Sequence, residues 1–225
     1  MWSPPPAAVG QALTPYQVLQ QALENGQRVI EALKKYQCVQ DAKVQPVKPD
    51  FIFAGTYHRV SRLYHDRTGG DAETVVEQKS DVSGDYRISG AFLERLARFY
   101  YFLMGAASTE SYDFNYVGQE RVDELNTYVF DVRPKAHKLA AKAGGVRYLK
   151  GRIWIDGQDL QVVKVAGEIA PAPGLHRTPR FETYFQNFGK YWFPTYSWAD
   201  DDLFDGDEVF RAIIVIRYSE YKREG

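Results

Sequence analysis

The sequence lacks the features that mark disulfide-stabilised, membrane-spanning and nucleic-acid-binding proteins. It has a single cysteine, Cys38, which excludes an intramolecular disulfide framework and any site with several cysteine ligands. It has no run of about eighteen or more apolar residues, so we expect no helix that crosses a membrane. The formal charge is −1, from 28 basic and 29 acidic residues, which gives no overall attraction to nucleic acid or to an anionic membrane. We interpret Cys38 as a small buried residue of a strand rather than a reactive thiol.

Motifs of catalytic and metal sites are also missing. The chain has four histidines, and none lies in a metal-binding spacing such as H-E-x-x-H: His58, His65, His137 and His176. It contains no phosphate-binding glycine loop and no G-x-S-x-G nucleophile motif. The acidic run Asp200–Glu208 fails as a calcium loop because Leu203 and Ala212 stand where oxygen ligands are required. We therefore expect no catalytic residue, metal or cofactor, and we interpret 200–208 as a solvated loop between strands.

Aromatic residues and segments of strand character are abundant. Aromatic side chains make up 15% of the chain, with 16 Tyr and 13 Phe, which suits strands better than a helical bundle. The predicted strands are Tyr36–Val44, Phe51–His65, Ala72–Lys79, Tyr112–Arg121, Leu125–Arg133, Val146–Ile155, Leu160–Ile169, Arg180–Phe188, Tyr191–Trp198 and Glu208–Tyr221. Because they follow one another with short breaks, we expect near-sequential antiparallel strands in one large curved sheet.

The clearest hairpin signal lies between Val146–Ile155 and Leu160–Ile169. The two runs flank Asp156-Gly157-Gln158-Asp159, and a break that contains Asp-Gly between strand formers is typical of a hairpin. Ile153 and Ile155 alternate with Trp154 and charged residues, so one face is aliphatic and the other mixed. The cross-strand register stays open, because the break can hold a two-residue turn or a longer loop.

Two segments have helical character. In the first, Thr14 is placed as the N-cap, Pro15 as the first helical residue and Gln17 as the partner of a capping box. An apolar stripe then continues to Leu33, and Asn25-Gly26 interrupts it and can split the helix in two. Residues 1–12 are rich in Pro and Ala and predict a flexible arm.

The second helical segment, Ser89–Met104, is apolar on one face. Two interpretations are open: a lid or plug over a cavity, or an ordinary helix that covers the core. The residues of that face are Phe92, Leu96, Phe99 and Leu103.

Two surface features suggest contacts without requiring them. The segment Pro134–Lys150 is basic and could meet phosphate headgroups or an acidic partner, but we favour a solvated hairpin loop without a function. The aromatic residues of 184–198 could stack on bases or sugars, but basic residues do not alternate with them. We therefore expect no nucleic-acid binding.

The hairpin also carries a resemblance to a known family. Gly151–Asp156 reads G-R-I-W-I-D and Leu160–Glu168 reads L-Q-V-V-K-V-A-G-E; together they resemble the hairpin of periplasmic proteins with the LolA/LolB-type fold. The flanking pieces Phe114–Glu120, Thr127–Pro134 and Tyr191–Pro194 occur in the same order. The resemblance extends from about residue 110 to about residue 221. This family includes the outer-membrane lipoprotein-sorting proteins and the RseB/MucB-type sensors.

The resemblance implies an α+β fold that is mainly antiparallel β. Residues 13–225 would form one domain, a large curved sheet or incomplete β-barrel wrapped around two helical segments. It further implies a non-enzymatic, monomeric periplasmic protein whose signal peptide has been removed. Such a protein would carry or sense a lipid or the acyl chains of a lipoprotein in an apolar cavity, and would touch a membrane peripherally at most.

We expect the cavity or its lid to be lined by Phe92, Leu96, Phe99, Leu103, Ile153, Ile155, Val163 and Val165. The alternative is a module whose helices fill the concavity and which binds another envelope protein. A hydrophobic probe that binds saturably would distinguish the two.

Overall fold

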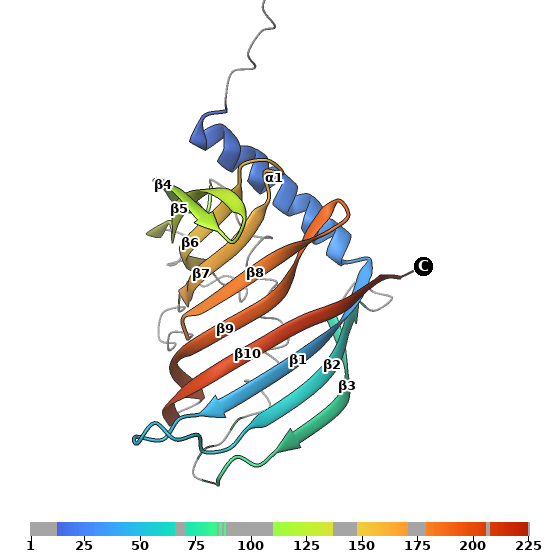
Figure 1. Ribbon diagram of the computed structural model, residues 1–225, viewed down its shortest axis with the longest axis vertical. Helices are drawn as coiled ribbons and strands as arrows, with labels where there is room; N and C mark the ends of the chain where they lie inside the picture. Colours follow the sequence, from blue (N-terminus) through green and yellow to red (C-terminus); the bar gives the residue numbers. More distant parts are fainter. Residues whose placement is uncertain are drawn as a thin grey trace, which may run out of the picture.

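The computed structural model describes residues 13–65, 71–84, 86, 88, 110–136, 148–170, 179–205 and 208–224. Within these ranges, ten antiparallel strands form one open sheet in the order β3-β2-β1-β10-β9-β8-β7-β6-β5-β4 (Figure 1). The predicted arm 1–12 and the predicted helix Ser89–Met104 lie outside the described residues. The strands are β1 Tyr36–Pro46, β2 Tyr57–His65, β3 Asp71–Ser80, β4 Tyr112–Val122, β5 Leu125–Pro134, β6 Tyr148–Asp156, β7 Val162–Ala170, β8 Phe181–Phe188, β9 Tyr191–Asp205 and β10 Glu208–Arg223.

The sheet is open because the strands at the two ends of its order, β3 and β4, do not pair with each other among the described residues. β10 pairs with β1, with Asp41 opposite Arg217, while β3 and β4 occupy the two ends of the strand order. Figure 1 shows the strands as one long, curved layer, with α1 beside the ends of several of them. The expected incomplete barrel of antiparallel strands is confirmed, with one helix among the described residues.

The helix α1, Pro15–Leu33, begins as the sequence predicts. The Thr14 hydroxyl accepts a hydrogen bond from the Gln17 backbone N–H, and the Gln17 side chain accepts one from the Thr14 N–H, which completes the capping box. The predicted break at Asn25-Gly26 does not occur. Gly26 is buried, and Asn25 Nδ2 donates to the Leu160 carbonyl at 2.9 Å, so the helix continues against the β6–β7 loop. No helix of the described residues is both long and apolar enough to cross a membrane.

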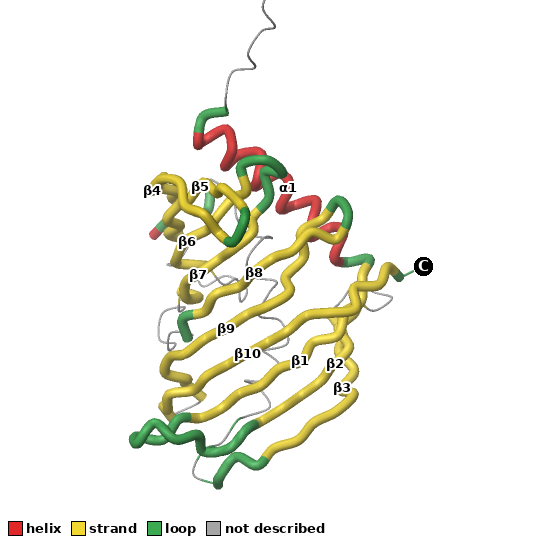
Figure 2. Tube along the Cα trace, viewed as in Figure 1, coloured by secondary structure: helices red, strands yellow, loops and turns green. Residues whose placement is uncertain are grey.

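α1 packs on one face of the sheet, which we call the inner face. Figure 2 shows the helix running from the region of β4 and β5 to the start of β1. Its buried stripe includes Val18, Ala22 and Val29, and the Tyr16 ring meets the Phe130 ring of β5 edge-on, at 6.0 Å between centroids. The stripe and the sheet share one apolar core, so burial of the stripe holds the helix in place.

Apart from β2 and β9, each predicted strand begins and ends within about two residues of the observed one. The prediction of a strand from Phe51 was wrong: β2 begins at Tyr57. Phe51 has a φ of 64° and Gly55 a φ of 117°, both in the left-handed region that a strand does not use. The register of the β6–β7 hairpin, left open by the sequence, is now defined. Ile155 pairs with Val162 across a loop of residues 157–161.

The interpretation of 200–208 as a solvated loop was wrong for 200–205. Residues 200–205 continue β9 and pair with β10, from Asp200 opposite Ile213 to Asp205 opposite Glu208. The acidic residues are tolerated in a strand because Arg211 of β10 lies beside Asp200 and donates to both of its oxygens, at 2.7 and 2.8 Å. These bonds hold the pKa of Asp200 below its usual range.

Candidate functional site

The inner face changes character from one end of the sheet to the other. Cross-strand pairing defines a single row of neighbours that begins at Arg59 of β2 and ends at Tyr116 of β4. It starts with a charge, passes a pair of hydroxyls that share a 2.8 Å hydrogen bond, Thr183 and Ser197, and ends among apolar side chains. The full row is Arg59, Ala42, Ile216, Ser197, Thr183, Val165, Ile153, Phe130 and Tyr116. The buried surface is therefore amphipathic along its length.

The polar end of this row belongs to a group that we call the inner polar cluster: Tyr57, Arg59 and Ser61 of β2 with Glu73 of β3. The three β2 residues alternate along the strand and so share one face. Arg59 Nη2 lies 2.8 Å from Glu73 Oε2 in an ion pair that is largely shielded from solvent. Tyr57 is 5% exposed and Ser61 is 0% exposed. Polar side chains in such positions are normally hydrogen-bonded.

Each member of the inner polar cluster carries a buried polar atom with no hydrogen-bond partner among the described residues. The atoms are Tyr57 Oη, Arg59 Nε, Ser61 Oγ and Glu73 Oε1. Burial raises the pKa of Tyr57. The positive charge of Arg59 and its side-chain contact with Tyr57 oppose that rise, and the hydroxyl keeps its proton at neutral pH. Each unpaired buried group costs about 1–3 kcal/mol. Four buried polar atoms that lack partners among the described residues make the inner polar cluster a candidate binding site.

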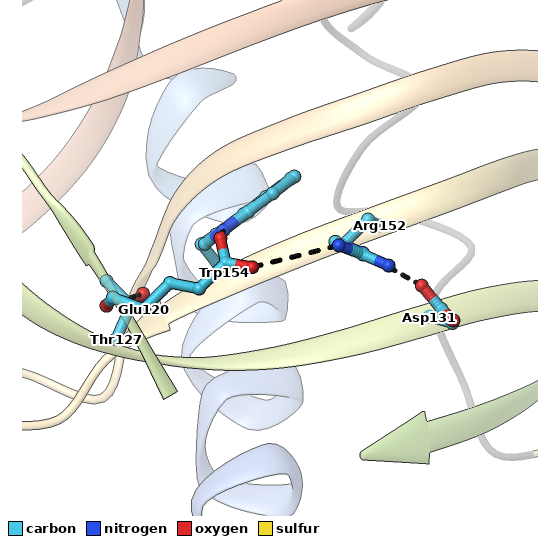
Figure 3. A network of polar contacts seen from close by, with 5 residues as sticks. All are labelled: Glu120, Thr127, Asp131, Arg152 and Trp154. Carbon is cyan, nitrogen blue, oxygen red and sulfur yellow. Dashed lines mark hydrogen bonds and ion pairs between the residues drawn. The ribbon is translucent and has the colours of Figure 1, made fainter. Parts of the chain in front are cut away.

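The opposite, outer face carries a network of charged and polar side chains that bond to one another (Figure 3). The Trp154 indole N–H donates to Glu120 Oε2 at 2.7 Å, and Arg152 Nε donates to Asp131 Oδ1 at 2.9 Å. The Thr127 hydroxyl donates to the Glu120 carbonyl at 2.7 Å and fixes that strand position. Since each donor has an acceptor, this network holds β4, β5 and β6 together and has a structural role.

The network continues over the Trp154 ring. Lys164 Nζ lies 4.9 Å from the ring centre and pairs with Glu182 at 2.9 Å. Burial alone would lower the pKa of Lys164, but its bonds to Glu182 and Tyr184 outweigh burial and raise that pKa. Lys164 therefore stays charged at neutral pH, which excludes it as a general base there.

The structure places part of the predicted cavity lining on the inner face. Ile153, Ile155, Val163 and Val165 are buried members of the core, on or beside the apolar half of the row. The other predicted lining residues, Phe92, Leu96, Phe99 and Leu103, lie outside the described residues. Whether these eight side chains contact a ligand stays a prediction.

Sequence reasoning missed the inner polar cluster. The segment Tyr57–His65 reads Y-H-R-V-S-R-L-Y-H, with polar residues on both faces, so its alternation gave no sign of an inner side. The pairing of β1 with both β2 and β10 defines the inner side of β2. Gln40 of β1 lies between Ser61 of β2 and Tyr218 of β10 on that face.

Other residues considered in the sequence have ordinary surroundings. His58 Nε2 lies 3.0 Å from Asp41 Oδ1 on a neighbouring strand, and no group of three or more metal-ligating side chains occurs within the described ranges. Cys38 is buried, and burial raises the pKa of its thiol to about 12, which makes it unreactive as the sequence suggested. Of the basic segment, Lys150 pairs with Glu168 at 3.2 Å, while 137–147 lies outside the described residues.

No family model and no curated protein matches the chain. Solved structures similar to it include a LolA superfamily protein from Nitrosomonas europaea, with 14% identity, 95% of both chains covered and a TM-score of 0.43. A lipoprotein-sorting protein domain from Vibrio parahaemolyticus has 12% identity, covers 91% of this chain and 92% of its own, and has a TM-score of 0.39. The MucA/MucB complex of Pseudomonas aeruginosa gives 12% identity, 94% and 99% coverage and a TM-score of 0.25.

Proposed function

We propose that this protein is a non-enzymatic periplasmic carrier or sensor of an amphiphilic ligand, such as a lipid or the acyl chain of a lipoprotein. The observation that carries the proposal is the amphipathic inner face, which joins the inner polar cluster to the apolar side chains of β5, β6 and β7. A ligand with one polar and one apolar end matches such a surface in both of its halves. The chain offers no catalytic motif that would favour turnover of the ligand.

The apolar half would hold the hydrocarbon part of the ligand. Ile153, Val165 and Phe130 line the row at this end and expose no polar side-chain atom. A buried chain gains about 0.8 kcal/mol per CH₂ group, so ten methylenes contribute roughly 8 kcal/mol before the entropy of binding is subtracted. Burial of the hydrocarbon chain therefore supplies most of the binding free energy.

The inner polar cluster would select the polar end of the ligand. Tyr57 and Ser61 offer hydroxyl groups, Arg59 offers one N–H, and Glu73 offers one carboxylate oxygen. Arg59 and Glu73 neutralise each other in their ion pair, so the cluster has no net charge to attract a charged group. It fits a neutral end that both accepts and donates hydrogen bonds, such as the ester and hydroxyls of an acylglycerol.

A second candidate is a module that binds another envelope protein, with a filled concavity. It is favoured by three consecutive exposed apolar residues in the connection between β1 and β2: Phe51, Ile52 and Phe53 are 75%, 60% and 47% exposed. Exposed apolar patches of this kind mark contact surfaces. The complete burial of Ile155 and Val165 is also compatible with a filled inner face.

Removal of one hydroxyl on each face of β2 tests the first candidate. We expect Tyr57→Phe to weaken binding of a monoacylglycerol by roughly 2- to 10-fold, the value of one hydrogen bond. Stability should be unchanged or higher, because the variant removes an unpaired buried group. The measurement is displacement of a fluorescent hydrophobic probe by the monoacylglycerol.

The matched control is Tyr64→Phe, which removes a hydroxyl from the outer face of the same strand and should leave binding unchanged. Equal affinities for the wild type and both variants would separate the inner polar cluster from ligand binding. A wild-type protein that takes up neither probe nor monoacylglycerol would favour the envelope-protein module.

A further inference from the structure

A positively charged hollow of about 420 Å³ lies outside the inner polar cluster, where three parts of the chain meet. Its walls come from the C-terminal half of α1 with the start of β1, from the β8–β9 turn, and from the end of β10. Figure 1 shows these three parts side by side near the C-terminus. Its main lining residues are Arg28, Lys35, Tyr36, Lys190, Tyr191 and Arg223. It shares no residue with the inner polar cluster, so binding in this hollow is independent of the proposed function.

The cations of this hollow are not neutralised by ion pairs with other described residues. Four of its residues are basic, Arg28, Lys35, Lys190 and Arg223, and none of them forms an ion pair within the described part of the chain. The one carboxylate in the lining, Glu31, lies 2.7 Å from Lys34 Nζ, a cation that does not line the hollow. Even the partial negative charge of a helix C-terminus, about half an elementary charge, leaves the hollow positive.

The backbone and two aromatic rings fix the walls of the hollow. Tyr36 pairs with Arg223 across β1 and β10, and the Glu224 N–H donates to the Lys35 carbonyl at 2.8 Å. The Tyr36 and Tyr191 rings both pack on Phe193, with centroids 5.0 and 5.9 Å from it. The backbone of two of the four cations, Lys35 and Arg223, is therefore held by hydrogen bonds and strand pairing. The two tyrosine rings of the hollow pack against the core through Phe193.

We propose that this hollow binds a phosphate ester. Cationic side chains from separate segments provide charge-assisted donors for the non-bridging oxygens of a phosphate group, and two tyrosine rings line the hollow beside them. The volume exceeds that needed for a bare anion, so it leaves room for the sugar or glycerol that carries the phosphate. The phosphate ester can belong to a lipid headgroup or to a soluble molecule, and the experiment distinguishes these sources.

The test compares two variants that remove the same number of positive charges. Lys35→Gln/Lys190→Gln removes two from the hollow, and Lys43→Gln/Lys48→Gln removes two from other parts of β1 and its following loop. The probes are glycerol 3-phosphate in calorimetry and phosphatidylcholine vesicles with or without phosphatidic acid in co-sedimentation. We expect saturable binding by the wild type, a loss of roughly ten-fold in the hollow variant and less than about two-fold in the control.

Each outcome is decisive. Binding of glycerol 3-phosphate supports a soluble phosphate ester, and binding only of vesicles that contain phosphatidic acid supports a lipid headgroup. A second hollow variant, Arg28→Gln/Arg223→Gln, should reproduce the loss if the first variant is poorly folded. Three results would overturn the proposal. They are binding of neither probe, an equal loss in the control variant, and binding of an acidic peptide, polyglutamate, but of neither phosphate ester. None of these results depends on uptake of a hydrophobic ligand by the inner face.

Discussion

Replacement of Phe193 by alanine is expected to lower the free energy of unfolding by about 3–5 kcal/mol, the usual cost of removing a buried phenylalanine ring. Phe193 is 0% exposed, and its ring lies 4.8 Å from that of Tyr221 and 5.0 Å from that of Tyr36. It therefore joins β9 to the last strand and to the start of the first. Removal of the ring would leave a cavity between elements that are far apart in the sequence.

The matched control for this prediction is Phe188→Ala. Phe188 stacks on the Phe193 ring at 5.8 Å but is 39% exposed, so its removal should cost less than half as much. Urea denaturation followed by tryptophan fluorescence measures both values. Equal losses in the two variants would contradict the role of Phe193 as the centre of the aromatic group.

The second large effect is expected for Trp154→Ala, with a loss of about 3–5 kcal/mol. Trp154 is on the outer face, yet it is only 7% exposed because polar side chains cover it. The variant removes the ring beneath Lys164 and leaves Glu120 without the indole N–H that it accepts at 2.7 Å. Both losses act on the strands β4, β6 and β7.

Trp154→Phe separates these two contributions. It keeps an aromatic ring but removes the hydrogen bond to Glu120, and we expect it to lose about 1–3 kcal/mol. Denaturant titration of the two variants should therefore rank alanine below phenylalanine. A loss below about 0.5 kcal/mol for alanine, the value typical of a surface position, would show that the ring contributes nothing to the fold.

Local patterns in the sequence were sufficient to predict most of the strands. The β6–β7 hairpin shows why: Ile153 and Trp154 point to opposite faces because side chains alternate along a strand, and this holds whatever the rest of the chain does. The start of α1 was predictable for the same reason, since the Thr14 and Gln17 contacts of the capping box are local.

The errors arose where a distant residue decides the local structure. Arg211 neutralises Asp200 from the next strand, so an acidic run that resembles a loop forms a strand. The Leu160 carbonyl accepts a hydrogen bond from Asn25, 135 residues away in the sequence, and the helix continues through a predicted break. The inner polar cluster and the positively charged hollow could not be predicted from the sequence for the same reason. Each gathers residues from strands or segments whose pairing the sequence does not state.

The central claim, that the inner face holds an amphiphile, is tested most directly by native mass spectrometry of the purified protein with organic extraction of any bound molecule. We predict that a lipid or acyl species with an uncharged, hydrogen-bonding end co-purifies with the protein. A protein that carries no such species and also fails to take up a hydrophobic probe would contradict the claim and favour the envelope-protein module.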